Sequence, residues 1–175
     1  MEFFLSYTGN IKTTGHTDTK FRYRRYFLPQ FRKMKEHLEA NHFPEHMMFS
    51  KHKERRVGDF CFSPLVTYDC KKVIDFEIVL LTHFEPACSS RYPTGDADNL
   101  LKTLLDSLRM AQNKNEIRGQ KPLEGEEPFY CLMEDDQLVR DIKLRHDKLL
   151  FPQKENMKKK DAFILVKAMI HSKYS

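Results

Sequence analysis

A strongly apolar stretch followed by a leucine-rich one, within residues 73–112, limits the folds that this chain can adopt. Residues 73–84 are dense in β-branched and aromatic side chains, which favours a strand. Odd and even positions both lean apolar, so we expect a central strand covered on both faces. Residues 99–112 place apolar side chains on one arc of a helical projection, which predicts an amphipathic helix. These side chains are Leu100, Leu101, Leu104, Leu105, Leu108 and Ala111.

Weaker patterns predict two elements near the start of the chain. Residues 2–8 are rich in aromatic residues and predict a first strand. Apolar residues recur at helical spacing over residues 29–40, which predicts an amphipathic helix with Pro29 in its first turn. At 175 residues the chain has the length of one ordinary domain.

Three further strands are expected later in the chain. Residues 57–68 suggest a short edge strand or an extended arm, because Pro64 has no amide hydrogen to donate to a sheet. Residues 138–144 and 162–170 predict two closing strands, joined by a solvated hairpin connection that contains Lys154 and residues 158–160. We therefore expect one α+β domain over residues 1–175, with a small mixed β-sheet packed against two main helices.

Two polar segments are predicted to be loops. Residues 41–56 carry a basic run without a strict period, which indicates a mobile basic loop. Pro44 breaks any helix that would place His42 and His46 on one face, which argues against a histidine metal site there. Residues 113–128 have no apolar period, and loops of that length are usually functional or disordered.

The composition excludes several classes of protein. A net charge of +5 is compatible with a polyanionic partner but is common in proteins that bind none. The four cysteines show no C-x-x-C pair or zinc-finger spacing, which favours a reduced, intracellular setting. No segment approaches the roughly 18 apolar residues of a membrane-spanning helix. We expect a cytoplasmic protein without a secretion signal or membrane anchor.

Aromatic and basic residues interleave over residues 20–27. Arginine and aromatic side chains together can grip a nucleic-acid backbone and stack on exposed bases. The alternative is a helix entrance that buries Phe21 and Phe27 and leaves the arginines in water. The sequence pattern leaves both interpretations open.

Two acidic groups are the strongest candidates for chemistry. Asp96 and Asp98 lie in the turn that opens the leucine-faced helix, and Asp135 and Asp136 precede a later strand. Mg²⁺ prefers oxygen ligands, usually one or two carboxylates with water and substrate phosphate completing the shell. Helix capping and a polar turn are the simpler explanations of each group alone. If the groups converge, however, their mutual repulsion requires a cation or raised pKa values.

Lys102 lies one helical turn after Asp98, on the same stripe of the helix. It can pair with a carboxylate or reach a phosphate oxygen; a surface ion pair with Asp106 is the alternative. A calcium-binding loop is excluded, because Leu100 and Leu101 stand where an EF-hand needs an oxygen ligand and its glycine.

These residues resemble the signature of the RusA family of Holliday junction resolvases. That signature reads D-x-D-N-x-x-K-x-x-x-D-x-L, followed by D-D-x-x-V. The first half matches residues 96–108 and the second matches residues 135–139. The resemblance is sharp over 96–108 and 134–140 and elsewhere extends only to the order of strands and helices. It implies a RusA-like fold.

The resemblance also implies roles for single residues. Asp96, Asp98 and Asp136 match the catalytic metal-binding carboxylates, Lys102 matches the lysine required for cleavage, and Asp135 matches the neighbouring acid, a further candidate ligand. The family is dimeric and cuts branched DNA at paired sites with Mg²⁺. We expect one or two ions per site, with Mn²⁺ as a possible substitute.

Three features depart from the family pattern. Gly95 stands where a basic residue often precedes the first aspartate, the loop 113–128 is longer than in compact members, and the basic segment 41–56 is an addition. They bear on substrate geometry more than on metal chemistry. Two interpretations of loop 113–128 stay open: plain disorder, and a lid or junction-inserting element.

Basic stretches are expected to supply a sequence-independent grip on DNA phosphates. The candidate DNA-binding residues are Arg22, Arg24, Arg25, Lys51, Lys53, Arg55 and Arg56, with residues 158–160 as a further basic stretch. The function that the resemblance implies is that of a Mg²⁺-dependent homodimeric endonuclease that resolves four-way junctions in DNA recombination and repair. Such a protein is nucleoid-associated when bound to DNA, with phage or host origin left open. The alternatives are a non-catalytic branched-DNA binding protein and a related nuclease acting on flaps or forks.

Overall fold

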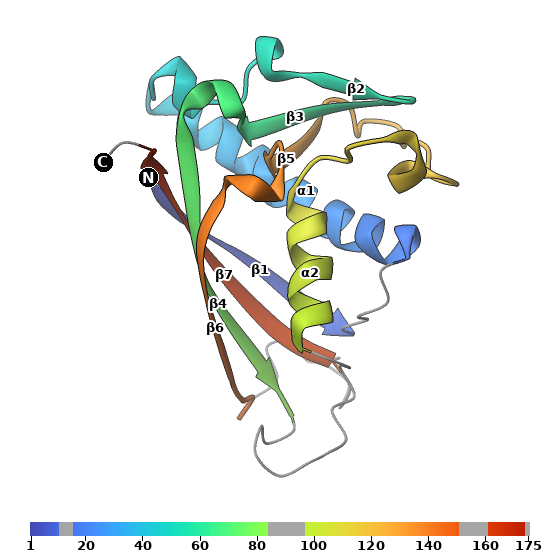
Figure 1. Ribbon diagram of the computed structural model, residues 1–175, viewed down its shortest axis with the longest axis vertical. Coiled ribbons are helices and arrows are strands. Elements are labelled where there is room, and N and C mark those ends of the chain that lie inside the picture. The colour runs from blue at the N-terminus through green and yellow to red at the C-terminus, as the bar shows by residue number, and fades with distance from the viewer. Residues whose placement is uncertain (11–15, 84–96, 151–160, 174–175) are drawn as a thin grey trace.

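Two helices and two β-sheets form an α+β structure (Figure 1). The computed structural model describes residues 1–10, 16–83, 97–150 and 161–173, and for Ala97 and Asp98 it describes the backbone only. The helices are α1 (Thr17–Ala40) and α2 (Ala97–Leu108). The strands are β1 (Glu2–Asn10), β2 (Arg55–Val57), β3 (Phe60–Val66), β4 (Lys72–Thr82), β5 (Phe129–Met133), β6 (Val139–Lys148) and β7 (Asp161–Ser172).

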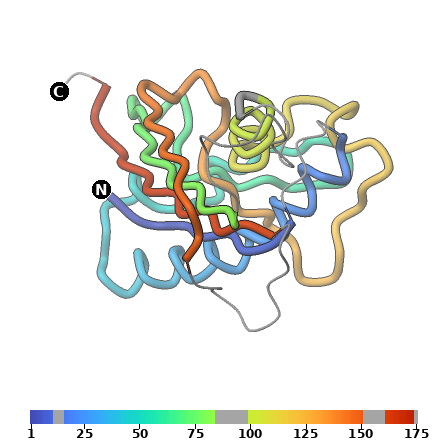
Figure 2. The backbone as a smooth tube through the Cα atoms, turned by 90° about the horizontal axis from the view of Figure 1, so that it is seen from below, coloured from blue at the N-terminus to red at the C-terminus, as the bar shows by residue number. Residues whose placement is uncertain are grey.

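The larger sheet has the strand order β1-β7-β4-β6, which Figure 2 shows from below as neighbouring blue, red, green and orange strands. Strand β7 is antiparallel to both β1 and β4, whereas β6 is parallel to β4. The two closing strands are confirmed, but they do not form a hairpin, because β4 lies between them. The lysines at residues 154 and 158–160 lie outside the described residues.

Strand β4 is central, as predicted, but the expectation that both its faces are covered is wrong. Ile74 and its alternate neighbours up to Thr82 are buried, while the intervening side chains are only partly buried. The partly buried face carries Asp75 and Glu77 among its apolar residues. Carboxylates need water or a partner, so this face stays accessible to solvent.

The smaller sheet has the order β2-β3-β5, with β3 antiparallel to β2 and parallel to β5. The expected edge strand at residues 57–68 is therefore the middle strand β3, and all its residues are buried. Pro64 is tolerated because β2 pairs only with Phe60–Phe62, which leaves one side of β3 free at this point.

Helix α1 begins at Thr17, well before the predicted start at Pro29. Pro29 lies in the helix interior, where it lacks an amide hydrogen and loses one helical hydrogen bond. Phe21, Phe27 and Phe31 are each at most 1% exposed on this helix. Burial of three phenylalanines on both sides of the proline outweighs the lost hydrogen bond.

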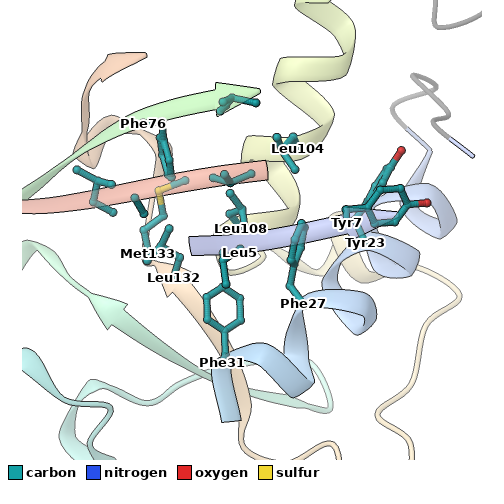
Figure 3. Close-up of a cluster of buried hydrophobic side chains, with 14 of the residues drawn as sticks. Leu5, Tyr7, Tyr23, Phe27, Phe31, Phe76, Leu104, Leu108, Leu132 and Met133 are labelled. Atoms are coloured by element: carbon teal, nitrogen blue, oxygen red, sulfur yellow. The ribbon is translucent and has the colours of Figure 1, made fainter. Parts of the chain in front are cut away.

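Both helices pack on the larger sheet and form the main core. Figure 3 shows Phe27 and Phe31 of α1, Leu104 and Leu108 of α2, and Leu5 of β1 in this cluster. The predicted leucine-faced helix is confirmed, although it ends at Leu108 and not at residue 112. A second cluster, the aromatic cluster, joins the first half of α1 to the smaller sheet around four phenylalanines, Phe21, Phe60, Phe62 and Phe129.

Neither polar loop is as loose as its sequence indicates. Residues 41–56 form two short 3₁₀ turns, at Glu45–Met47 and Lys51–Lys53, and Phe49 packs into the core. The expectation of a mobile basic loop is therefore not met. Within residues 113–128 a further 3₁₀ turn, Lys114–Ile117, buries Ile117 at the aromatic cluster. An ion pair of 2.8 Å between Glu126 and Arg25 fastens the same loop to α1.

In the ranges that the structure describes, no helix combines the length and the apolar character needed to span a membrane.

Candidate active site

The first turn of α2 carries part of the predicted site. Its backbone includes Asp98, whereas Asp96 lies outside the described residues. The amide groups at the start of a helix lack helical partners and give this end a partial positive charge. Lys102 follows one turn later, is exposed, and has no ion-pair or hydrogen-bond partner among the described residues.

The second acidic group lies in the turn between β5 and β6. The Asp135 side chain accepts a hydrogen bond from the amide of Gln137 and opens a 3₁₀ turn, Asp136–Leu138. The Glu134 amide donates to the Val66 carbonyl at 2.8 Å. These bonds fix the acidic turn to the end of the smaller sheet.

This turn lies at the C-terminal end of α2. The amide of Met110 donates to the carbonyl of Met133 at 2.9 Å, and Arg109 Nε lies 3.9 Å from Asp136 Oδ2. With a rise of about 1.5 Å per residue, residues 98 and 109 are about 16 Å apart along the helix. The structure therefore holds the Asp98 backbone and the Asp136 carboxylate at opposite ends of α2 within one chain (Figure 1).

Asp106, the last acid of the first half-motif, belongs to a buried charge network. It is 4% exposed and forms ion pairs of 2.7 Å with both Lys20 and Arg109. Arg109 also pairs with Glu116 at 3.0 Å. Burial alone would raise the pKa of Asp106, but the hydrogen bond from Lys20 and the charge of Arg109 hold this pKa below its ordinary value. A surface pair between Lys102 and Asp106 is therefore excluded.

Asp136 has a different environment. Its side chain is 48% exposed, and its contact with Arg109 is long. Burial raises the pKa of Asp136, a hydrogen bond with the Asp135 carboxyl raises it further, and Arg109 opposes both. Asp135 and Asp136 are thus a close acidic pair whose repulsion a bound cation would relieve.

The described residues do not complete a metal site by themselves. Among them, no group of three or more histidine, cysteine, aspartate or glutamate side chains is placed to hold a metal ion. Asp135 and Asp136 supply two carboxylates, while the remaining predicted donors, Asp96 and Asp98, have side chains outside the description.

Two of the predicted DNA-binding residues are buried, which corrects their assignment. Arg24 is 1% exposed and donates to the carbonyls of Asp106 and Arg109, while its guanidinium lies over the Phe21 and Phe62 rings. Burial lowers the pKa of Arg24 to about 10.

Lys53 is the other. It is 3% exposed, and its ammonium donates to three backbone carbonyls, those of His46, Met48 and Leu65. Because its donors are taken, Lys53 stabilises the fold of the basic segment and is not available to a phosphate.

The remaining basic candidates divide into engaged and free residues. The engaged residues are three arginines: Arg22 donates to the Asn10 carbonyl, Arg25 binds Glu126, and Arg55 lies near Asp69 and Glu134. Lys51 and Arg56 are exposed and have no partner among the described residues. Of the two interpretations of residues 20–27, the structure supports the buried aromatics, although the arginines are mostly bonded to protein instead of lying in water.

Sequence reasoning missed a cavity of about 370 Å³ between the second half of α1 and the smaller sheet. Four separate segments line it: α1, residues 49–54, β3 and the start of β5. A local motif cannot show such a site. Ser63 within an otherwise apolar strand is the one signal that points to it.

Comparison of the chain with models of protein families, with curated proteins and with solved structures found no match.

Proposed function

We propose that this protein is a Mg²⁺-dependent, structure-specific endonuclease with a RusA-like fold that cuts branched DNA, including four-way junctions. The observation that carries the proposal is the start of α2, where Asp98 lies in the first turn and the exposed Lys102 follows without a partner among the described residues. An acid in the first turn of a helix and an exposed lysine one turn later suit a phosphate with its cation.

The acidic and basic residues would have separate roles. Asp96, Asp98 and Asp136 would hold Mg²⁺, with Asp135 beside them. Mg²⁺, when bound, supplies an activated water and neutralises charge on the phosphodiester. The Lys102 ammonium would bind a phosphate oxygen as negative charge grows there. Lys51 and Arg56 are the exposed cations left to bind phosphates along the DNA.

A homodimer would reconcile this role with the position of Asp136. Because one chain holds Asp98 and Asp136 at opposite ends of α2, we propose that Asp136 of the partner subunit completes each site. A two-fold axis would then create two equivalent sites, which suits paired cuts across a junction.

The direct test is cleavage of matched four-way, three-way and duplex DNA, with and without Mg²⁺. We expect Mg²⁺-dependent cuts in the branched substrates and their loss in the Asp98→Asn variant. Asp141→Asn is the matched control, because Asp141 is an exposed acid on β6 outside the site. Full cleavage by the Asp98→Asn protein would exclude this site.

A second function is favoured by one specific observation, the contact of Asp136 with Arg109 at the far end of α2 from Asp98. If the acids do not meet in any assembly, the protein is a branched-DNA binding protein without turnover. Such a protein would shift junction DNA on a gel and leave it uncut with either Mg²⁺ or Mn²⁺. If the protein cuts only flaps or forks, it is instead a related nuclease with a different substrate specificity.

A further inference from the structure

The cavity between α1 and the smaller sheet has the features of a ligand site. Its volume is about 370 Å³, and a second cavity of about 260 Å³ shares Lys35, Pro128 and Tyr130 with it. The two therefore form one groove along the second half of α1. The first cavity is also lined by Glu39, Phe49, Ser50, Lys51, Glu54 and Ser63.

One wall of the groove is a positioned aromatic ring. Tyr130 on β5 is partly buried, and the buried Phe49 packs against it with ring centroids 5.0 Å apart and ring planes at 68°. This edge-to-face contact fixes the Tyr130 ring. Its hydroxyl has no hydrogen-bond partner among the described residues, so the ring and its polar end are both available to a ligand.

A serine hydroxyl also lines the groove. Ser63 is 1% exposed and lies directly opposite Tyr130 in the pairing of β3 with β5. No other described residue forms a hydrogen bond with its side chain. A hydroxyl that lines a cavity and has no protein partner can donate to and accept from a ligand.

Charges of both signs complete the groove. Lys51 is exposed and has no partner in the described part of the chain, whereas Lys35 pairs with Glu39 at 2.6 Å. Glu54 accepts a weak hydrogen bond from the Cys61 thiol at 3.4 Å and retains further acceptor capacity. The groove thus offers an aromatic face, hydrogen-bonding groups of both kinds and an exposed cation.

This combination suits an unpaired nucleobase. Unpaired bases stack on aromatic side chains while their edges form hydrogen bonds, and lysines bind the flanking phosphates. The mixed carboxylate and ammonium lining argues against a simple anion site, because Glu39 and Glu54 would repel a phosphate inside the cavity.

We propose that this groove binds one unpaired base of a DNA substrate, with the base stacked on Tyr130, its edge bonded to Ser63 and Glu54, and the adjacent phosphate on Lys51. The proposal rests on the proposed function for the kind of ligand, DNA. It gives the protein a means to recognise single-stranded segments at branch points, separate from the acids that would cut.

The test measures binding without metal, so that it does not depend on cleavage. The probes are a duplex and the same duplex with a short single-stranded gap that contains 2-aminopurine, both in EDTA. The wild-type protein should change 2-aminopurine fluorescence on binding and should bind the gapped DNA more tightly. Tyr130→Leu should weaken gapped-DNA binding by about 10-fold and leave duplex binding unchanged, given the usual contribution of one stacked base.

Tyr68→Leu is the matched control, because Tyr68 is 50% exposed and lies outside the groove. Tyr130→Phe keeps the ring and should retain most of the affinity, which separates stacking from any general damage to the fold. The proposal is overturned if the wild-type protein leaves the 2-aminopurine signal unchanged, or if Tyr130→Leu and Tyr68→Leu bind gapped DNA equally. Loss of cleavage with intact base binding would instead overturn only the proposed nuclease function.

Discussion

The two ends of helix α2 use the same kinds of charged residue in opposite ways. At the C-terminal end, the buried Asp106 and Arg109 pair with each other, and Asp106 also pairs with the partly buried Lys20 of α1. At the N-terminal end, Lys102 is exposed and unpaired within the described residues. Paired, buried charges hold elements of the fold together, whereas an unpaired, exposed charge is free to bind a ligand. A single half-motif therefore contains both structural and candidate functional positions.

The largest expected effect is on cleavage at the N-terminal end. Lys102→Met should lower the cleavage rate on the order of 100-fold, because it removes a charge that would be used at the reacting phosphate. The free energy of thermal unfolding should change by less than about 0.5 kcal/mol, since the Lys102 side chain is exposed. Lys143→Met on β6 is the control. A large loss of stability in Lys102→Met would show that this end of the helix is structural as well.

Mixing two inactive variants tests whether the two ends of α2 meet across a dimer. In an equal mixture of Asp98→Asn and Asp136→Asn subunits, about half of the dimers contain one of each after free exchange. If Asp136 of the partner subunit completes each site, such a mixed dimer has one intact site and should nick a junction on one strand. If each site lies within one chain, the mixture should stay as inactive as either variant alone.

Stability should depend mainly on the C-terminal end. Asp106→Asn removes the buried carboxylate that pairs with Lys20 and Arg109, so we expect the free energy of unfolding in urea to fall by about 3 kcal/mol. Asp141→Asn should change the free energy of unfolding by less than about 0.5 kcal/mol. Equal effects of the two substitutions would mean that the buried network does not stabilise the fold.

The smallest expected effect is on the pH dependence of the stability that the Asp106 ion pairs contribute. The pKa of Asp106 is lowered in the folded protein, so its contribution is complete above the ordinary carboxyl pKa of about 3.9 and is lost as the pH falls through the lower folded value. The stability difference between wild type and Asp106→Asn should therefore be constant from pH 7 to about 4 and should narrow below that. Urea unfolding across this range measures it, and a difference that stays constant to pH 2 would contradict the assignment.

Local patterns predicted the elements whose burial follows one period. Helix α2 was predicted from the spacing of its leucines, which also indicates its packed face. Strand β4 was predicted from its β-branched and aromatic residues, but apolar side chains on both faces concealed which face is packed. The predictions of a helix start at Pro29 and of an edge strand at Pro64 were wrong for the same reason. The cost of a missing amide is local and visible in sequence, whereas the burial that compensates for it around Phe31 comes from distant elements.

The candidate site was predicted in its parts but not in its arrangement. Spacing places Asp98 and Lys102 on one helix, and the structure agrees. The position of Asp136 depends on how β5 returns beside the end of α2, which no local pattern records. Nor does sequence distinguish Arg24 and Lys53, whose charges are buried, from Lys51 and Arg56, whose charges are exposed.

The central position of β7 sets the order in which the larger sheet can form during synthesis. Residues 2–10 and 72–82 leave the ribosome long before residues 161–172, which lie between them in the sheet. Until then β1 lacks its neighbour and β4 has only β6, so strand edges that end up paired are open to other chains. The nascent protein is therefore expected to be most prone to aggregation just before its last strand emerges, and to depend on chaperones at that stage.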